Sequence, residues 1–155
     1  MSHLAKVLTI SDSVYAGTRQ DGSGPAVVSR LTDAGISVVD AVTVADGIEA
    51  VGDALRHLVS EFAGVVVTTG GTGFGPRDLT PEATLLVVDR VAPGLAESMR
   101  SASPQGRLSR AVAGTIGKCL VVNVPGSPKG AIECLDAVLD VIPHALELLA
   151  GRHPH

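Results

Sequence analysis

The sequence predicts an α/β fold in which helices cover both faces of a mostly parallel sheet. Short runs rich in Val, Ile and Leu alternate along the chain with segments whose apolar residues recur at helical spacing. Hydrophobic residues make up 45% of the chain but aromatic residues only 2%, so the core must be aliphatic, as in sheets buried on both faces. At 155 residues, we expect one domain spanning residues 1–155.

The first half of the chain is predicted to hold three strands and two helices. The strands are the apolar runs 4–10, 36–44 and 64–69. A helix is expected from about Pro25 to Ala34, where Gly35 ends it. The run Asp46-Gly47-Ile48-Glu49 has the form of a capping box, and the apolar residues after it keep helical spacing through Phe62.

The second half is predicted to add an antiparallel segment to the sheet. The runs 112–116 and 119–124 flank Gly117-Lys118, which suits a tight hairpin turn. Helices are expected near 81–90 and 94–101, and a polar loop over 101–107. A long helix carries an apolar stripe from Ile132 to Leu149, and Pro143 should kink or restart it. The prediction is therefore a three-layer α/β/α fold with a short antiparallel edge.

A glycine-rich loop follows the third predicted strand. It reads Thr69-Gly70-Gly71-Thr72-Gly73 and leads to a helix start with Thr80 as the expected N-cap and Pro81 in the first turn. Glycines leave main-chain N–H groups accessible, and the helix N-terminus behind them favours anions. The chain has neither G-x-G-x-x-G at this loop nor the Gly-Lys-Ser/Thr of a P-loop. We therefore expect a phosphate-binding loop of another kind.

Charge and composition exclude several classes of function. A net charge of -4 argues against non-specific binding of nucleic acid or of an anionic membrane. No apolar run approaches the roughly 20 residues that span a bilayer, and the first residues lack the apolar core of a signal peptide. We expect a cytoplasmic protein. Cys119 and Cys134 are too few for a disulfide framework and are expected to be reduced packing residues.

The glycine loop and the segment Arg77-Asp78-Leu79-Thr80-Pro81-Glu82-Ala83-Thr84 resemble the signature of the molybdopterin adenylyltransferase family. This family includes the bacterial Mog and MoaB proteins, the plant Cnx G domain and the gephyrin G domain. Further segments match the family pattern in order along nearly the whole chain: Ile10-Ser11-Asp12-Ser13, Val44-Ala45-Asp46, Pro93-Gly94-Leu95, Leu108-Ser109-Arg110, Ala113-Gly114 and Asn123-Val124-Pro125-Gly126-Ser127-Pro128-Lys129.

The resemblance implies the fold of molybdenum cofactor biosynthesis proteins and a reaction that consumes Mg-ATP. The terminal phosphate of molybdopterin would attack the α-phosphorus of ATP, giving adenylylated molybdopterin and pyrophosphate. The resemblance also implies a homotrimer, and a separate molybdenum insertase that takes the product onward.

The resemblance assigns residues to this reaction as well. Asp46 and Asp78 match the family's essential acidic pair, and we expect them to hold Mg²⁺, because carboxylates beside phosphates repel unless a cation lies between them. The phosphates of ATP would lie on Thr69, Gly70, Gly71, Thr72 and Gly73. The molybdopterin pocket would use Ser109, Asn123, Pro125, Gly126 and Ser127, with the Asn123 amide pairing with an edge of the pterin.

Alternatives stay open for individual residues. Asp46 can act as a helix N-cap alone, and Asp78 as a solvated loop acid. Arg77 and Lys129 suit a phosphate contact or an exposed surface position equally well. Ser103 lies in a loop that looks shorter than the family's, so its correspondence stays undecided.

Two other functions compete with the transferase. One is a non-catalytic paralogue that binds molybdopterin or serves as a scaffold. The other is a hydrolase of nucleotide pyrophosphates. Retention of both Asp46 and Asp78 favours the enzyme over the binder, and the segment from Asn123 to Ser127 favours the pterin substrate over the hydrolase.

Overall fold

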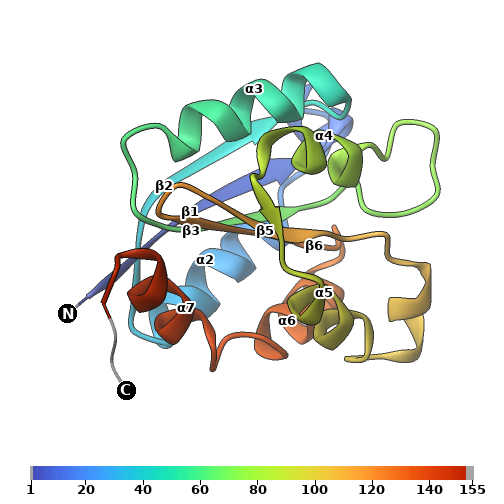
Figure 1. Ribbon diagram of the computed structural model, residues 1–155. Coiled ribbons are helices and arrows are strands. Elements are labelled where there is room, and N and C mark those ends of the chain that lie inside the picture. Colours follow the sequence, from blue (N-terminus) through green and yellow to red (C-terminus); the bar gives the residue numbers. More distant parts are fainter. Residues whose placement is uncertain (1, 153–155) are drawn as a thin grey trace.

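The computed structural model describes residues 2–152. A six-stranded sheet runs through its centre in the order β2-β1-β3-β6-β5-β4 (Figure 1). Four neighbouring strands are parallel, namely β2 (Ile36–Val44), β1 (His3–Ile10), β3 (Gly64–Thr69) and β6 (Cys119–Val124). Two antiparallel strands complete it, β5 (Ala113–Ile116) and β4 (Arg90–Val91). The predicted parallel sheet with an antiparallel edge is confirmed.

Helices cover both faces of this sheet, which confirms the three layers (Figure 1). One face carries α3 (Ile48–Val59) and α4 (Thr80–Val87). The other carries α2 (Ser23–Asp33), α5 (Pro93–Arg100), α6 (Pro128–Asp136) and α7 (Ile142–Leu149).

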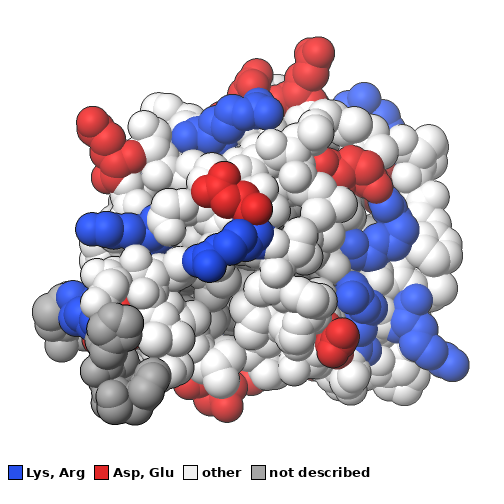
Figure 2. Space-filling model, in the orientation of Figure 1, with Lys and Arg blue, Asp and Glu red and all other residues white. Residues whose placement is uncertain are grey.

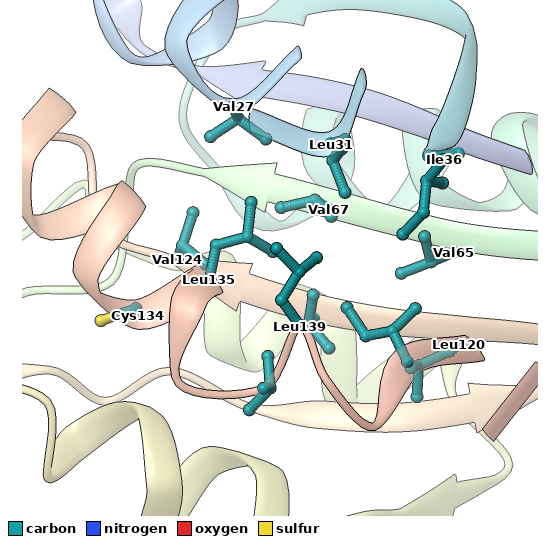
Figure 3. Close-up of a cluster of buried hydrophobic side chains, with 14 of the residues drawn as sticks. Val27, Leu31, Ile36, Val65, Val67, Leu120, Val124, Cys134, Leu135 and Leu139 are labelled. Atoms are coloured by element: carbon teal, nitrogen blue, oxygen red, sulfur yellow. The ribbon is translucent and has the colours of Figure 1, made fainter. Parts of the chain in front are cut away.

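An aliphatic cluster fills the space below the sheet. In Figure 3, Val27 and Leu31 of α2 face Val65 and Val67 of β3, and Leu135 of α6 packs beside them. All are fully buried. β3 and β6 are buried along their whole length, as expected of central parallel strands that read as continuous apolar runs.

The last predicted helix is two helices. α6 ends at Asp136, and α7 begins at Ile142 with Pro143 in its first turn. Proline has no N–H to donate, so it fits the first turn, where that group needs no partner inside the helix. The expectation that Pro143 restarts the helix is therefore confirmed.

Both predicted N-caps are wrong. The N-cap of α3 is Gly47 with φ 118, and no side chain caps the helix, so Asp46 makes no capping box. The N-cap of α4 is Leu79, whereas the Thr80 hydroxyl donates to the carbonyl oxygen of Gly70 at 2.9 Å. Because Thr80 is fully buried, that bond anchors the glycine loop to the start of α4.

Short elements that the sequence did not predict occupy two loops. α1 (Asp12–Tyr15) directly follows β1, and a 3₁₀ helix, η1 (Pro104–Leu108), lies within the polar segment after α5. The two-residue strand β4 was also not predicted. In the part of the chain that the structure describes, no helix has the length and apolar character to cross a membrane.

The carboxyl ends of the four parallel strands meet at one edge of the sheet. The chain leaves β1 at Ser11, β2 at Ala45, β3 at Gly70 and β6 at Pro125. In α/β sheets this edge is where ligands bind. Nearly all residues that the sequence singled out lie at or next to these four exits.

Candidate functional site

A cavity of about 760 Å³ lies at the carboxyl edge of the sheet. Its walls come from the glycine loop, from the turn after β6, from η1 and from the loop before α2. This volume is in the usual range for small-molecule sites. Of the predicted site residues, those that line it are Gly71, Thr72, Gly73, Asp78, Ser109, Pro125, Gly126 and Ser127.

Thr69 and Gly70 form the base of the glycine loop and do not line the cavity. Thr69 is fully buried, and its Oγ1 is hydrogen-bonded to Ser23 Oγ at 2.9 Å and to the carbonyl oxygen of Pro125 at 2.8 Å. The Gly70 N–H donates to the Val124 carbonyl at 3.0 Å. Gly70 has φ 106, and a side chain there would clash with the Ile10 carbonyl. These two residues join the exits of β1, β3 and β6.

The next three main-chain N–H groups are free. Within residues 2–152, no carbonyl or side chain accepts a hydrogen bond from the N–H of Gly71, Thr72 or Gly73. The Thr72 hydroxyl also has no protein partner there. Because unpaired donors are uncommon in folded chains, three in succession on a cavity wall form a ready site for an anion.

Arg110 holds the other side of the same loop. Its main-chain N–H donates to the Thr72 carbonyl at 2.8 Å, and its Nε donates to the Gly73 carbonyl at 2.9 Å. Its Nη2 donates to the Asp78 carbonyl. In a trans peptide the C=O and N–H point in opposite directions, so the N–H that follows each engaged carbonyl points away from Arg110. From the sequence, Arg110 stood out only as part of the segment Leu108-Ser109-Arg110, with no predicted role.

In Asp46 and in Asp78, one carboxylate oxygen accepts a hydrogen bond from a main-chain N–H group, and the other oxygen accepts none from the described residues. Asp46 Oδ2 accepts the Asp12 N–H at 2.9 Å, and Asp78 Oδ2 accepts the Gly75 N–H at 2.9 Å. Neither Oδ1 accepts a hydrogen bond from any described residue. Burial raises the pKa of Asp46, and the charges of Asp12 and Asp78 raise it further. Both predicted acids lie against the glycine loop, since a Cβ on Gly71 would be 3.1 Å from Asp46 Oδ1 and a Cβ on Gly73 would be 3.1 Å from Asp78 Oδ2. Asp78 lines the cavity, whereas Asp46 does not.

The open carboxylate oxygens of Asp46 and Asp78 suit a hard divalent cation that takes its other ligands from outside the protein. Among residues 2–152, no group of three or more His, Cys, Asp or Glu side chains is arranged to hold a metal ion. Mg²⁺ commonly binds one or two carboxylates and takes its remaining ligands from phosphates and water. The open oxygens of Asp46 and Asp78 suit that mode, whereas a closed protein cage for Zn²⁺ or Ca²⁺ would need more protein ligands.

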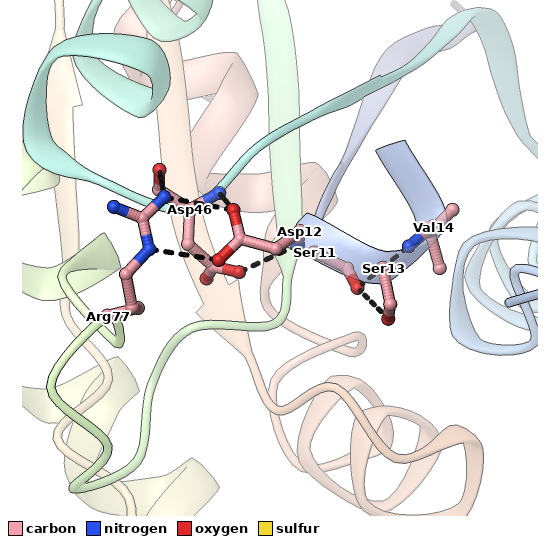
Figure 4. A network of polar contacts seen from close by, with 6 residues as sticks. All are labelled: Ser11, Asp12, Ser13, Val14, Asp46 and Arg77. Carbon is pink, nitrogen blue, oxygen red and sulfur yellow. Dashed lines mark hydrogen bonds and ion pairs between the residues drawn. The ribbon is translucent and has the colours of Figure 1, made fainter. Parts of the chain in front are cut away.

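Asp12 and Arg77 surround Asp46, a relationship that the sequence analysis did not predict. Arg77 Nε and Nη2 donate to the two carboxylate oxygens of Asp12, each at 2.9 Å, and Nη2 also reaches the Asp46 carbonyl at 2.9 Å (Figure 4). The guanidinium lowers the pKa of the Asp12 carboxyl. The Nε and Nη2 groups of Arg77 therefore donate to other protein groups, and Arg77 does not line the cavity.

Two serines on the opposite wall keep a donor for a ligand. Ser109 Oγ accepts the Ala111 N–H at 3.2 Å, and Ser127 Oγ accepts the Gly130 N–H at 3.1 Å. Each hydroxyl hydrogen stays available to the cavity, since both oxygens act as acceptors in these bonds. Ser103 also lines the cavity, whereas Lys129 is almost fully exposed and lies 3.9 Å from Glu133.

Asn123 does not reach the cavity, so the expected pairing of its amide with a pterin is wrong in this geometry. Its Nδ2 donates to Thr68 Oγ1 at 2.9 Å and to Thr84 Oγ1 at 3.1 Å, and its Oδ1 accepts the Val112 N–H at 3.0 Å. The side chain is fully buried. It ties β6 to β3, to α4 and to the segment before β5, which places the cavity walls relative to one another.

The cavity wall also includes residues for which the sequence predicted no role. Arg19 and Gln20, in the polar loop before α2, lie on its wall, and so does Gln105 of η1. Glycine content and hydrophobic periodicity give no signal for such residues. They enter the site only because the loop after β1 folds back toward the exit of β6.

Comparison with known proteins agrees with this geometry. A family model described as "Probable molybdopterin binding domain" matches residues 6–144. The molybdopterin adenylyltransferase of Helicobacter pylori strain J99 is 38% identical over 154 residues, which cover 95% of this chain and 88% of that protein. The molybdopterin adenylyltransferase of Escherichia coli K12 is 36% identical over 166 residues, covering 95% and 85%.

Solved structures give the same result. The crystal structure of the molybdopterin biosynthesis enzyme MoaB from Thermus thermophilus superposes with a TM-score of 0.90 at 42% identity, covering 97% of this chain and 98% of that one. The Mog protein from Mycobacterium ulcerans superposes with a TM-score of 0.89 at 40% identity, covering 98% and 99%. The chain therefore belongs to the molybdopterin-binding domain family of molybdenum cofactor biosynthesis.

Proposed function

We propose that this protein is a molybdopterin adenylyltransferase that uses Mg-ATP. One observation carries the proposal: three consecutive free N–H groups and the half-open carboxylate of Asp78 line a single cavity, and the half-open carboxylate of Asp46 lies against the same glycine loop. The relatives that share the family and cover nearly the whole chain carry the name of this activity. A phosphate-transfer site needs donors for phosphate oxygens and a place for a cation, and this cavity offers both.

The glycine loop is the proposed binding surface for the phosphates of ATP. The N–H groups of Gly71, Thr72 and Gly73 and the Thr72 hydroxyl would donate to phosphate oxygens. Arg110 keeps the loop in place by holding its carbonyls, so the donors need no rearrangement when the nucleotide arrives.

Asp46 and Asp78 are the proposed ligands of Mg²⁺ through their open Oδ1 atoms. When bound there, the ion would neutralise charge on the transferred phosphoryl group and on the leaving pyrophosphate. The N–H groups of Asp12 and Gly75 fix the other oxygen of each carboxylate and so set its direction.

The chemical step needs no general base. The terminal phosphate of molybdopterin is already largely ionised near neutral pH, because the second pKa of a phosphate monoester is about 6. One of its oxygens bonds to the α-phosphorus of ATP, while the bond from that phosphorus to the bridging oxygen breaks and pyrophosphate leaves. The residues of the chain act by binding and aligning the two phosphates.

The wall formed by η1 and the turn after β6 is the proposed molybdopterin site. Ser109 and Ser127 offer hydroxyl donors there, and Arg19 adds a positive charge. Figure 2 shows Lys and Arg side chains along the right-hand side of this face, where Figure 1 places the carboxyl end of the sheet. The positive charge of Arg19 on the cavity wall favours anionic substrates even though the net charge is -4.

Pyrophosphate release from Mg-ATP, measured with and without molybdopterin, tests the proposal. We expect release that depends on molybdopterin. Release with ATP alone would identify a nucleotide pyrophosphate hydrolase. No release from a folded protein that binds molybdopterin would identify a non-catalytic binder or scaffold.

We further propose a homotrimer that works in the cytoplasm, where ATP is abundant, and passes its product to a molybdenum insertase. Exposed apolar side chains on α4 and β4 support self-association, since Leu85, Leu86 and Val91 are each at least half exposed. Light scattering with size-exclusion chromatography should give the mass of three chains. A monomer at micromolar concentration would contradict the trimer.

A further inference from the structure

Most N–H donors of Arg77 form hydrogen bonds to other groups of the protein. Its Nε and Nη2 make a bidentate pair with the Asp12 carboxylate, and Nη2 also donates to the main-chain carbonyl of Asp46. The guanidinium lies over Gly47, the residue before α3, where a Cβ would be 4.0 Å from both terminal nitrogens. Arg77 therefore joins the loop after β3, the start of α1 and the start of α3.

Asp12 and Asp46 hold each other in place. The Asp12 N–H donates to Asp46 Oδ2 at 2.9 Å, and the Asp46 N–H donates to Asp12 Oδ1 at 3.1 Å (Figure 4). This reciprocal pair brings two carboxylates close together, and their mutual repulsion opposes it. The Arg77 guanidinium supplies the compensating charge by its ion pair with the Asp12 carboxylate.

We propose that Arg77 is a positioning residue which, through Asp12, keeps Oδ1 of Asp46 directed toward the glycine loop. That Oδ1 lies against Gly71, since a Cβ on Gly71 would be 3.1 Å from it. The inference deepens the proposed function, because it names the residue that prepares one of the two proposed metal ligands.

The fork geometry of arginine matters in this arrangement. One planar group reaches both oxygens of Asp12 and a carbonyl on a neighbouring segment, and a lysine ammonium has no such fork. Partners that orient metal ligands typically change metal affinity by about 10- to 100-fold when removed. The effect of losing Arg77 should therefore appear first in metal affinity.

The test compares Arg77→Gln, Arg77→Lys and Asp12→Asn with the wild type. Arg56→Gln is the matched control, because Arg56 is an exposed arginine on α3 whose partner is the neighbouring Asp53 at 3.3 Å. Mn²⁺ serves as a spectroscopic substitute for Mg²⁺, and electron paramagnetic resonance measures its dissociation constant without any turnover. The Mg²⁺ dependence of pyrophosphate release and circular dichroism complete the set.

We expect Arg77→Gln to raise the Mn²⁺ dissociation constant and the half-saturating Mg²⁺ concentration by about tenfold. At saturating Mg²⁺ its KM for molybdopterin should stay within about twofold of the wild type. Asp12→Asn should weaken Mn²⁺ binding in the same direction, Arg77→Lys should restore it only in part, and Arg56→Gln should match the wild type.

Three results with the Arg77 variants would overturn the inference. One is a folded Arg77→Gln protein with wild-type Mn²⁺ affinity, and another is full recovery of that affinity in Arg77→Lys. The third is a raised KM for ATP that saturating Mg²⁺ does not relieve, which would mean that Arg77 contacts the nucleotide. A wild type that binds no Mn²⁺ overturns this inference together with the metal role. If the wild type binds Mn²⁺ but releases no pyrophosphate, only the proposed activity is contradicted, and the role of Arg77 in metal binding still stands.

Discussion

Arg110 and Glu82 form an ion pair between the two halves of the chain, with Nη1 of the arginine 2.6 Å from Oε2 of the glutamate. Glu82 lies in the first turn of α4, and Arg110 precedes β5. The same guanidinium donates to the carbonyls of Gly73 and Asp78. One side chain from the second half therefore fixes both the glycine loop and the helix that follows it.

Replacing this arginine should loosen the loop. In Arg110→Gln, two loop carbonyls lose a donor and Glu82 loses its partner, while the buried Glu82 Oε1 already accepts no hydrogen bond from the described residues. We expect the free energy of unfolding to fall by about 1–3 kcal/mol and the KM for ATP to rise by about tenfold. Thermal unfolding and initial-rate kinetics measure the two effects. Arg56→Gln is the control, and equal behaviour of both variants would contradict the role of Arg110.

The ion pair also gives the fold a dependence on pH. Arg110 lowers the pKa of the Glu82 carboxyl in the folded state. A depressed folded-state pKa adds stability above the unfolded-state value, and this contribution disappears as the pH falls through the folded-state value. Urea unfolding of the wild type and of Glu82→Gln should therefore differ near pH 7 and converge as the pH falls through the lowered folded-state pKa of Glu82. A difference that stays constant over this range would contradict the assignment.

Asn123 should behave as a structural residue. Asn123→Ala removes three hydrogen bonds from a fully buried site and leaves Thr68, Thr84 and the Val112 N–H without this partner. We expect a loss of about 2–4 kcal/mol in the free energy of unfolding, measured with chemical denaturant. A variant with native stability and a raised KM for molybdopterin would show instead that the amide contacts the substrate.

Gly71 should tolerate no side chain. It has φ 70, and a Cβ there would clash with the Thr80 hydroxyl, which anchors the loop. We expect Gly71→Ala to raise the KM for ATP by about tenfold or more and to lower the melting temperature. Gly94→Ala is the matched control, because a Cβ at this position of α5 meets open space. Native kinetics in Gly71→Ala would exclude the proposed role of the loop.

The strands and the layers of the fold were predictable, and most helix boundaries nearly so. The runs Ile36–Val44 and Gly64–Thr69 are strands with the expected bounds, and both are rich in the β-branched residues that favour strands. Gly64–Thr69 is buried throughout, whereas only Ile36 is buried in the strand Ile36–Val44. Gly35, with φ 83, follows the C-cap of α2 as expected. Periodicity carries this information because it records which face of each element is buried.

The helix starts were predicted wrongly because local signals were overridden by tertiary contacts. Asp46 has the sequence of a cap, but its carboxylate faces Asp12 at the exit of a neighbouring strand. Thr80 likewise directs its hydroxyl to Gly70, ten residues earlier. Capping patterns consider only residues that are close in the sequence. Both side chains instead bond to residues that are distant in the sequence and lie at the same edge of the sheet.

The cavity was predictable in part. The glycine loop and the turn after β6 stood out because strand exits on one edge of a parallel sheet must converge. The same rule applied to β1 would have found Asp12, which follows that strand by two residues. It would not have found the buried position of Asn123, because the sequence of a strand that is apolar on both faces does not show where a polar residue points.

The most direct test follows the α-phosphate of ATP. With a radioactive label in that phosphate, the account predicts labelled molybdopterin in amounts that match the pyrophosphate released. Asp46→Asn and Asp78→Asn should lose this transfer by at least about a hundredfold while their circular dichroism stays native. Label found only in free AMP, or undiminished transfer by either folded variant, would contradict the claim that these acids and the glycine loop join ATP to molybdopterin.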